Sequence, residues 1–453
     1  MNIPLFLIIS SIFAVFYFLI GLYASRKVQS THDYFLAGRN LGLASVTFTL
    51  IATQLGGGML LGTSQEAYSY GIYGILYTLG MAIGFLILGS GVAAKMQSLG
   101  VSTTAELFET KYHSTGLKKF ASLLSITTMC GILLGQVVGS KILIAGLGVH
   151  NEPLFIGLWL FIITYTMIGG LEAVVLTDLF QVLVIIAVFA AIFCYSLIFE
   201  PASFFTFNGL RTIQAQFTQT PMGMSQLVAT LSMPALFSLI EQDLAQRFFS
   251  ARSKKVAALS ALIASAFLIL FSLVPIYFGT KAKLLGLNIA PDTSPLIPVL
   301  NVLTNDFMLV LAVCAIVAAV TSTADSLLCA ISSNVAQDFD FSWTGIANPL
   351  KRSQAITLII GGAALAGSYC VPQHVIPIII ESYAISVSCL FVPLIFAYFK
   401  KDVYKSAAIG AITCGLGTLI AIQFWNTELP KSLLPVLASF MGYMLFNKKE
   451  PHN

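Results

Sequence analysis

The sequence predicts an all-α membrane protein that crosses the bilayer about thirteen times. The chain has 453 residues, of which 57% are hydrophobic and only 9% are charged, whereas a soluble chain of this length needs more charge on its surface. The apolar residues gather in runs of about 20, the length that an α-helix needs to span a membrane. The third observation is the uneven distribution of lysine and arginine between these runs.

Thirteen apolar stretches are predicted to span the membrane. The first is followed by Arg26 and Lys27, and we expect it to be an anchor helix and not a cleaved signal peptide. The fifth is short, and only Gly169–Leu171 separates it from the sixth. The predicted spans are residues 3–24, 43–65, 71–95, 120–147, 153–169, 172–199, 224–246, 255–279, 303–334, 353–370, 375–398, 403–424 and 430–447.

The basic residues test this count, because cytoplasmic loops of membrane proteins carry an excess of Lys and Arg. With the N-terminus outside, eighteen of the 23 basic residues fall in inside loops, four in outside loops, and Lys141 within a span. If one span were missing or extra, all loops after it would change sides, and the excess of basic residues in inside loops would be lost there. The sequence therefore predicts a multi-pass protein of the inner (plasma) membrane with its N-terminus outside and its C-terminus in the cytoplasm. The inside residues are Arg26, Lys27, Arg39, Lys95, Lys111, Lys118, Lys119, Arg247, Arg252, Lys254, Lys255, Lys351, Arg352, Lys400, Lys401, Lys405, Lys448 and Lys449.

Two predicted spans contain residues that interrupt a helix. Gln54 and Leu55 precede three glycines, Gly56–Gly58, in the second span, and the seventh contains Met233-Pro234. Glycines weaken a helix and proline removes a backbone donor, so in lipid such breaks persist where they line a cavity or a ligand. The alternatives are close helix packing at the glycines and a simple kink at Pro234. Taken by itself, Pro234 favours the simple kink, whereas the three glycines favour a cavity.

The two breaks begin two stretches of five helices each. Matched interruptions of this kind predict an inverted repeat with a binding site near the membrane midplane. We expect four parts: a peripheral helix and cytoplasmic loop, the first repeat, the second repeat, and peripheral C-terminal helices, at residues 1–42, 43–199, 200–398 and 399–453.

Four motifs, in order along the chain, resemble one known family. They are His32–Arg39, Gly169–Val174 with Thr177, Asp178 and Gln181, Gln246-Arg247 with Ser250–Ser253, and Ser322–Ser326. From about residue 30 to 400 the chain resembles the sodium/solute symporters, which include proline and pantothenate permeases and sodium–galactose and sodium–sialic acid transporters. The resemblance implies a LeuT-type core of ten helices, preceded by one helix and followed by two, and transport by alternating access.

The resemblance also implies a sodium site. Its ligands would be the carbonyls of Ala52, Leu55 and Ala319 and the hydroxyls of Ser322 and Thr323. A hard cation prefers such oxygen ligands. Unwinding at the glycines would free the first two carbonyls, and Ala319 lies three and four residues before the hydroxyls, on the same helix face. The alternative is that these hydroxyls bond only to their own helix.

Acidic residues within spans are costly and mark functional sites. By the resemblance, Asp178 lies close to Ser322, Thr323 and Ser326, and in some relatives this acid helps bind a second sodium. Asp325 and Ser326, one turn beyond the main site, are expected to complete a second cation or proton site with it. The alternatives are a structural or gating role for Asp178, paired with a backbone or lysine partner, and a water-facing position for Asp325 near the inner end.

The solute is expected between the two breaks. Proline permease has an aspartate at the position of Gln54, and a tryptophan and a tyrosine at those of Pro234 and Ser238, so this sequence argues against proline. The polar and aromatic set of the sugar transporters is also missing from the seventh span. For any single candidate residue, the alternative to solute binding is a role in packing the core. The candidates are Gln54, Gly57, Met59, Gln136, Pro234, Phe237, Ser238, Glu241 and Tyr383.

Together these features predict a sodium-coupled secondary active symporter that imports a small organic solute, with an amino acid or organic acid favoured. Its partners are expected to be the solute, the lipid bilayer and Na⁺ as coupling ion, with no nucleic acid, in a monomer or weak homo-oligomer. The sequence contains no nucleophile–base pair or cofactor loop, so we expect no enzyme. Its seven cysteines lie in apolar stretches without a CxxC pair, which argues against disulfides or zinc.

Three alternatives remain open at this stage. A proton-coupled carrier, in which Asp178 or Asp325 titrates, would take up solute without sodium and follow pH. A transporter-like sensor would carry an attached signalling domain, and none is expected from the few residues after the last predicted span. A channel would not accumulate solute against a gradient.

The predicted orientation is testable with reporter tags. Tags fused to Met1 and Asn453 are expected to report opposite sides of the membrane, because thirteen is an odd number of crossings. Protease protection of the two tags in intact and opened cells measures this, and two tags on the same side would contradict the predicted topology.

Overall fold

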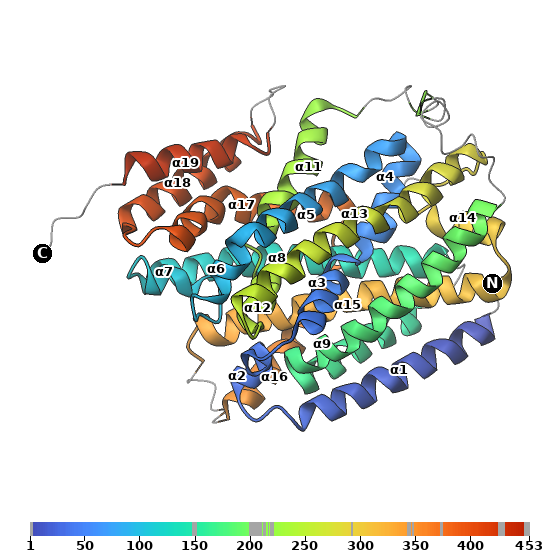
Figure 1. Cartoon of the computed structure of the whole chain (residues 1–453), viewed down its shortest axis with the longest axis horizontal. Coiled ribbons are helices and arrows are strands. Elements are labelled where there is room, and N and C mark those ends of the chain that lie inside the picture. Colours follow the sequence, from blue (N-terminus) through green and yellow to red (C-terminus); the bar gives the residue numbers. More distant parts are fainter. Residues whose placement is uncertain are drawn as a thin grey trace, which may run out of the picture.

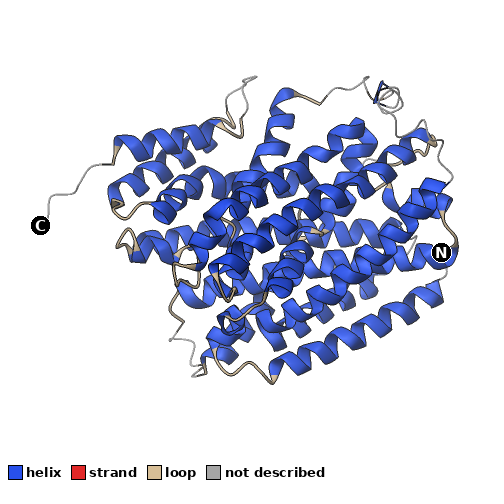
Figure 2. Ribbon diagram, viewed as in Figure 1, coloured by secondary structure: helices blue, strands red, loops and turns tan. Residues whose placement is uncertain are grey.

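The described part of the chain is helical. The computed structural model describes residues 3–146, 152–198, 211, 214–215, 217, 222–290, 293–341, 346, 348–371, 375–424 and 431–447. These residues contain no β-strand, and an isolated bridge pairs Leu41 with Ala251 (Figure 2). Eight of the described helices are long and apolar enough to cross a membrane, and three shorter apolar helices accompany them. The all-α membrane fold is thus confirmed, and the count of thirteen spans stays a prediction.

The main helices follow the predicted spans closely. In order they are α1 (Ile3–Ser25), α2 (Thr31–Leu36), η1 (Ala37–Arg39), α3 (Leu43–Gln54), η2 (Gly58–Gly62), α4 (Thr63–Tyr70), η3 (Gly71–Gly74), α5 (Ile75–Ile87), η4 (Leu88–Val92), α6 (Ala93–Gln97), α7 (Glu106–Thr110), α8 (Thr115–Gly146), α9 (Glu152–Ile198), α11 (Met224–Ser238), α12 (Gln242–Ser250), α13 (Lys254–Leu284), α14 (Leu296–Leu303), α15 (Asp306–Asp338), α16 (Pro349–Gly367), α17 (Val375–Phe399), α18 (Lys405–Ala421) and α19 (Leu434–Leu445).

Helices α3 and α12 lie near the middle of the bundle, and α11 extends from there to its upper edge (Figure 1). Helix α15 packs against α8 and α9, and α3 packs against α9 and α13. Helix α1 runs along one edge of the bundle against α9, while α18 and α19 pack on each other and on α17 at another edge (Figure 1). The predicted boundary between the two repeats, at residue 200, lies outside the described residues.

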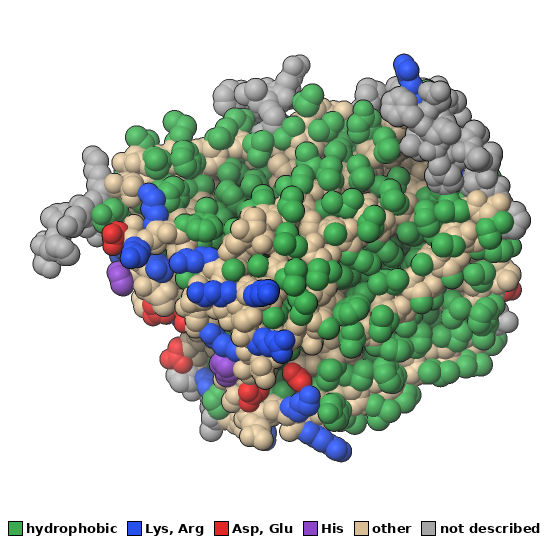
Figure 3. Space-filling view, viewed as in Figure 1, with side chains coloured by type: hydrophobic (Ala, Val, Ile, Leu, Met, Phe, Trp, Pro, Cys, Tyr) green, Lys and Arg blue, Asp and Glu red, His purple; other side chains and the backbone are tan. Residues whose placement is uncertain are grey.

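The surface of the molecule has the character of a membrane protein. On the face drawn in Figure 3, hydrophobic side chains cover most of the helical surface, and charged side chains gather mainly at the end that holds α2, α6 and α7. This segregation agrees with the uneven distribution of basic residues in the sequence. Arg247 is an exception, because the sequence predicts it in an inside loop and the structure buries it fully.

Helix α9 covers the fifth and sixth predicted spans and bends between them. Gly170 has φ 54° and ψ −150°, a conformation that essentially only glycine adopts, at the predicted boundary. The bend packs on α2, where the buried Tyr34 donates a hydrogen bond from its hydroxyl to the Met167 carbonyl at 3.0 Å. A Cβ atom on Gly170 would lie 2.5 Å from the Tyr34 carbonyl oxygen. Two of the four sequence motifs therefore meet in one packing contact.

The sequence predicts the break in the seventh span at Met233-Pro234, and this prediction is wrong. Pro234 lies within α11, and the helix ends at Ser238; Glu241 is extended, with φ −62° and ψ 130°, before α12 begins. Proline has a φ that suits a helix and removes only one backbone donor, so α11 continues for another turn past it. The break therefore falls at Leu239–Glu241.

The Gly170 bend predicts a specific loss of stability. Gly170→Ala is expected to lower the free energy of unfolding by about 1–3 kcal/mol, because an L-residue is strained at this φ and ψ and its Cβ meets the Tyr34 carbonyl. The thermal unfolding midpoint of the purified protein measures the effect. Gly157→Ala on the same helix is the control, since a Cβ there meets nothing within 4 Å. An equal midpoint for the two variants would contradict this account.

Candidate functional site

The first break lies between α3 and η2. Helix α3 ends at Gln54, the chain bends at Leu55 and Gly56, and it continues as the π-helical turn η2. The Gly57 N–H donates to Gln136 Oε1 of α8 at 2.8 Å, which satisfies a backbone group next to the bend. The predicted interruption by glycines is therefore confirmed, and α8 supplies the polar partner that the break requires.

A cluster of oxygen atoms joins this break to α15. The Ser322 hydroxyl donates to the carbonyls of Ala52 at 3.0 Å and Ala319 at 2.8 Å. The Thr323 hydroxyl donates to the Thr53 carbonyl at 2.9 Å and lies 3.5 Å from the Ala52 carbonyl oxygen. These side chains are buried. Four of the five predicted sodium ligands thus meet in one cluster.

The fifth, Leu55, is the buried residue that follows the last residue of α3. The next residue must be small, because a Cβ on Gly56 would collide with the Thr323 hydroxyl. The cluster fits a hard cation, since it consists of carbonyl and hydroxyl oxygens at the end of an interrupted helix. Among the described residues, no group of His, Cys, Asp or Glu side chains forms a metal site of another kind.

A second polar cluster lies one turn further along α15. Thr49 donates to Asp178 Oδ2 at 2.5 Å, and Thr53 and Ser326 share a hydrogen bond at 3.2 Å. The Arg247 guanidinium connects the two pairs, because Nε donates to Thr49 at 3.3 Å and a terminal nitrogen donates to Ser326 at 2.5 Å. Asp178 and Ser326 therefore belong to one network, as expected, but an arginine belongs to it too.

Asp325 points to another part of the core. It accepts a hydrogen bond from the Tyr165 hydroxyl of α9, and its second oxygen, Oδ1, has no partner among the described residues. Oδ1 of Asp178 has none either. Each of these buried carboxyls thus retains an oxygen that accepts no described hydrogen bond.

Between the two breaks lies a small cavity of about 20 Å³, which has room for one water-sized molecule. Five of the predicted substrate residues line it, together with residues that the sequence analysis missed, including Tyr77 and Asp243. The five are Gln54, Met59, Gln136, Glu241 and Tyr383.

Four other candidates do not line the cavity. Phe237 stacks on the Tyr383 ring, with centroids 4.4 Å apart, and so supports the wall from behind. The Ser238 hydroxyl donates to the Pro234 carbonyl at 2.7 Å and packs next to Gly84. The backbone N–H of Gly57 donates a hydrogen bond to the Gln136 side chain, which lines the cavity.

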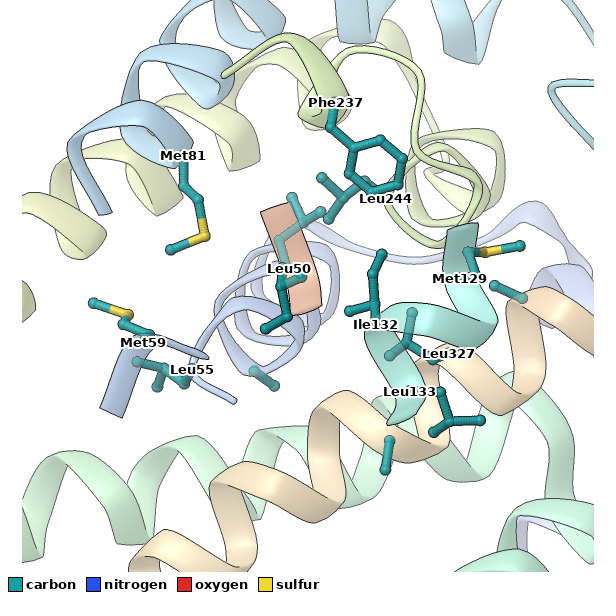
Figure 4. Close-up of a cluster of buried hydrophobic side chains, with 14 of the residues drawn as sticks. Leu50, Leu55, Met59, Met81, Met129, Ile132, Leu133, Phe237, Leu244 and Leu327 are labelled. Atoms are coloured by element: carbon teal, nitrogen blue, oxygen red, sulfur yellow. The ribbon is translucent and has the colours of Figure 1, made fainter. Parts of the chain in front are cut away.

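Apolar side chains enclose the break region. Figure 4 draws Leu50, Leu55 and Met59 from the α3–η2 segment together with Ile132 of α8 and Phe237 of α11. They belong to one buried hydrophobic cluster. An apolar wall with a few polar groups is typical of sites for small molecules.

A larger apolar cavity, of about 370 Å³, lies between α1, α8, α9 and α15. It includes Tyr165 and Tyr17 but none of the predicted sodium or solute residues. The candidate site is therefore the smaller cavity and the oxygen cluster beside it.

Solved structures with similar folds are transporters. A substrate-bound, outward-open Na⁺-coupled sialic acid symporter matches with a TM-score of 0.75 and 18% identity, and the match covers 98% of each chain. The nucleobase-cation-symport-1 family transporter Mhp1, in a closed conformation with bromovinylhydantoin bound, matches with a TM-score of 0.63 and 13% identity over 91% of this chain and 93% of that one. The inward-facing conformation of Mhp1 matches with a TM-score of 0.51 and 13% identity, over 89% of each chain. The chain thus has the LeuT-type fold of these transporters.

A comparison of the sequence with protein families identifies the family of this chain. The Sodium:solute symporter family matches residues 34–415, which is most of the chain and includes both helix breaks, the oxygen cluster on α15 and the small cavity. This chain belongs to the sodium:solute symporter family.

Proposed function

We propose that this protein is a sodium-coupled symporter that imports a small organic solute, an amino acid or an organic acid, by alternating access. The observation that carries the proposal is the contact of the Ser322 and Thr323 hydroxyls with the Ala52 carbonyl at the end of α3. Membership of the sodium:solute symporter family and similarity to a Na⁺-coupled symporter support it. The proposed Na⁺ ligands are the carbonyls of Ala52, Leu55 and Ala319 and the hydroxyls of Ser322 and Thr323.

The small cavity beside this cluster is the proposed solute site. Thr323 borders both the oxygen cluster and the cavity, so occupancy of one affects the other directly. A potential of ~100 mV contributes roughly 2.3 kcal/mol per charge moved, and a tenfold sodium gradient adds about 1.4 kcal/mol. One Na⁺ could therefore hold a neutral solute about 500-fold concentrated.

Asp178, Asp325 and Ser326 are the proposed second cation or proton site. Arg247 already donates to Ser326, so a second Na⁺ between Asp178 and Ser326 requires the guanidinium to move. A proton-coupled carrier is the second candidate function, and the oxygens of Asp178 and Asp325 that lack a partner among the described residues favour it. Uptake that follows pH and persists without sodium would support that candidate.

The proposed location is the inner (plasma) membrane, with the N-terminus outside and the C-terminus in the cytoplasm. The charged side chains that gather at one end of the face in Figure 3 support this orientation. A monomer or a weak homo-oligomer is proposed.

The first prediction concerns the sodium cluster. Ser322→Ala is expected to raise the sodium concentration for half-maximal uptake by roughly tenfold or more, because it removes one oxygen ligand of a charged ion. Sodium-dependent uptake into proteoliposomes, with a panel of labelled amino acids and organic acids, measures this. Ser260→Ala is a matched control, since the buried Ser260 hydroxyl donates to the Ala257 carbonyl three residues earlier, as Ser322 does to Ala319. An unchanged sodium dependence of Ser322→Ala would reject the site.

The second prediction concerns Asp178. Asp178→Asn keeps the shape of the side chain and removes its charge from the network of Thr49 and Arg247. We expect a changed steepness of the sodium dependence or a lower maximal uptake rate, measured in the same proteoliposomes. Asp402→Asn, at an exposed carboxyl, is expected to leave both unchanged. Wild-type kinetics for Asp178→Asn would remove this residue from the mechanism.

A further inference from the structure

Two carboxyl groups line the small cavity at the break between α11 and α12. Glu241 is the residue before α12, and Asp243 lies in its first turn. Their exposed fractions are 6% and 1%. The Leu244 N–H donates to Asp243 Oδ1 at 2.7 Å, so the helix N-terminus supports negative charge here. The second break thus presents acidic groups, whereas the first presents backbone carbonyls.

Within the described structure, neither carboxyl forms a salt bridge or accepts a hydrogen bond from a basic side chain. The two carboxyls approach each other, and Arg247 acts on Glu241 through its charge alone. Asp243 Oδ2 is buried and accepts no hydrogen bond from an N–H or hydroxyl group of the described residues, and the residues that line the cavity include no Lys, Arg or His. Arg247, one turn further along α12, uses its N–H groups elsewhere. It donates to the Asp243 carbonyl at 2.6 Å, and otherwise to Thr49 and Ser326. A buried carboxyl without a partner is costly, so a ligand that brings positive charge and N–H donors would be favoured here.

The rest of the cavity wall suits the same ligand. The Tyr77 and Tyr383 hydroxyls lie 3.2 Å apart on the wall, and the Tyr383 ring is fixed by stacking on Phe237. Aromatic faces attract cations. An anionic group, in contrast, would face two carboxyls and no described basic side chain.

We propose that the transported solute carries a positively charged nitrogen, a protonated amine, which Glu241 and Asp243 bind. This inference rests on the proposed function, because it names the solute class of the same site. It narrows the choice between amino acids and organic acids to solutes with an amino group, and it excludes organic acids that lack one. The cavity must widen to admit such a solute, as alternating access requires.

Matched probes test this inference on the purified full-length chain. Putrescine, 4-aminobutyrate and succinate share a four-carbon chain and carry two, one and no amino groups; ethanolamine, glycine and glycolate form a smaller set. The thermal unfolding midpoint is measured with each probe in Na⁺ and in K⁺ buffer. We expect at least one amine-bearing probe to raise the midpoint in Na⁺ buffer, and succinate and glycolate to leave it unchanged.

Two substitutions and a control assign the effect to the carboxyls. Glu241→Gln and Asp243→Asn are each expected to weaken the apparent affinity for the stabilising amine by about tenfold or more, the loss of one charge-assisted hydrogen bond. Glu66→Gln is the control, because Glu66 is a partly buried carboxyl on α4 that does not line the cavity. It should bind the amine as the unchanged protein does.

Three results would overturn the inference. The first is stabilisation by succinate or glycolate, and the second is stabilisation by none of the four amines. The third is that Na⁺ alone no longer stabilises Glu241→Gln or Asp243→Asn, because the carboxyls would then bind Na⁺ and not the solute. Failure of the proposed function is distinguishable, because Na⁺ alone would then fail to stabilise the unchanged protein.

Discussion

The contact between the end of α3 and the middle of α15 is the interaction on which the rest of the site depends. The last carbonyls of a helix lack partners in a following turn, and in lipid no water is present to satisfy them. Here the Ser322 and Thr323 hydroxyls approach these carbonyls, and Gly56 lets them do so because any Cβ would collide with Thr323. The same oxygens are the groups that Na⁺ requires, so one contact both closes the break and forms the proposed cation site.

Charge in the core is strongly unbalanced. Four buried carboxyls, Asp178, Glu241, Asp243 and Asp325, lie around the breaks, and Arg247 is the buried basic residue that contacts this region within the described structure. Buried carboxyls persist when a positive charge or a proton accompanies them. A protein that must receive cations and then release them gains from such an imbalance, since a fully paired core would hold no place for them.

The sequence predicted the parts of this structure that composition and backbone chemistry determine. Apolar runs located the helices, the three glycines located the break in α3, and spacing placed Ala319 on the same turn as Ser322. It failed where the direction of a side chain decides the outcome. Ser238 bonds to its own helix, and Pro234 does not end α11, because neither feature depends on residue type alone.

Arg247 and Asp243 show the same limit more clearly. The sequence predicts Arg247 in the inside loop that follows the span 224–246, but α12 (Gln242–Ser250) buries this residue inside the bundle. Only tertiary packing reveals that a polar helix is buried and that one of its carboxyls faces a cavity.

Equilibrium binding of radioactive ²²Na⁺ to the purified chain, without any solute, tests the central claim most directly. The account predicts saturable binding in K⁺ buffer that is lost when Gly56→Ala displaces Thr323 from the end of α3. Saturable binding that survives this substitution unchanged, or no saturable binding to the unchanged protein, would contradict the assignment of the sodium site to the contact between α3 and α15.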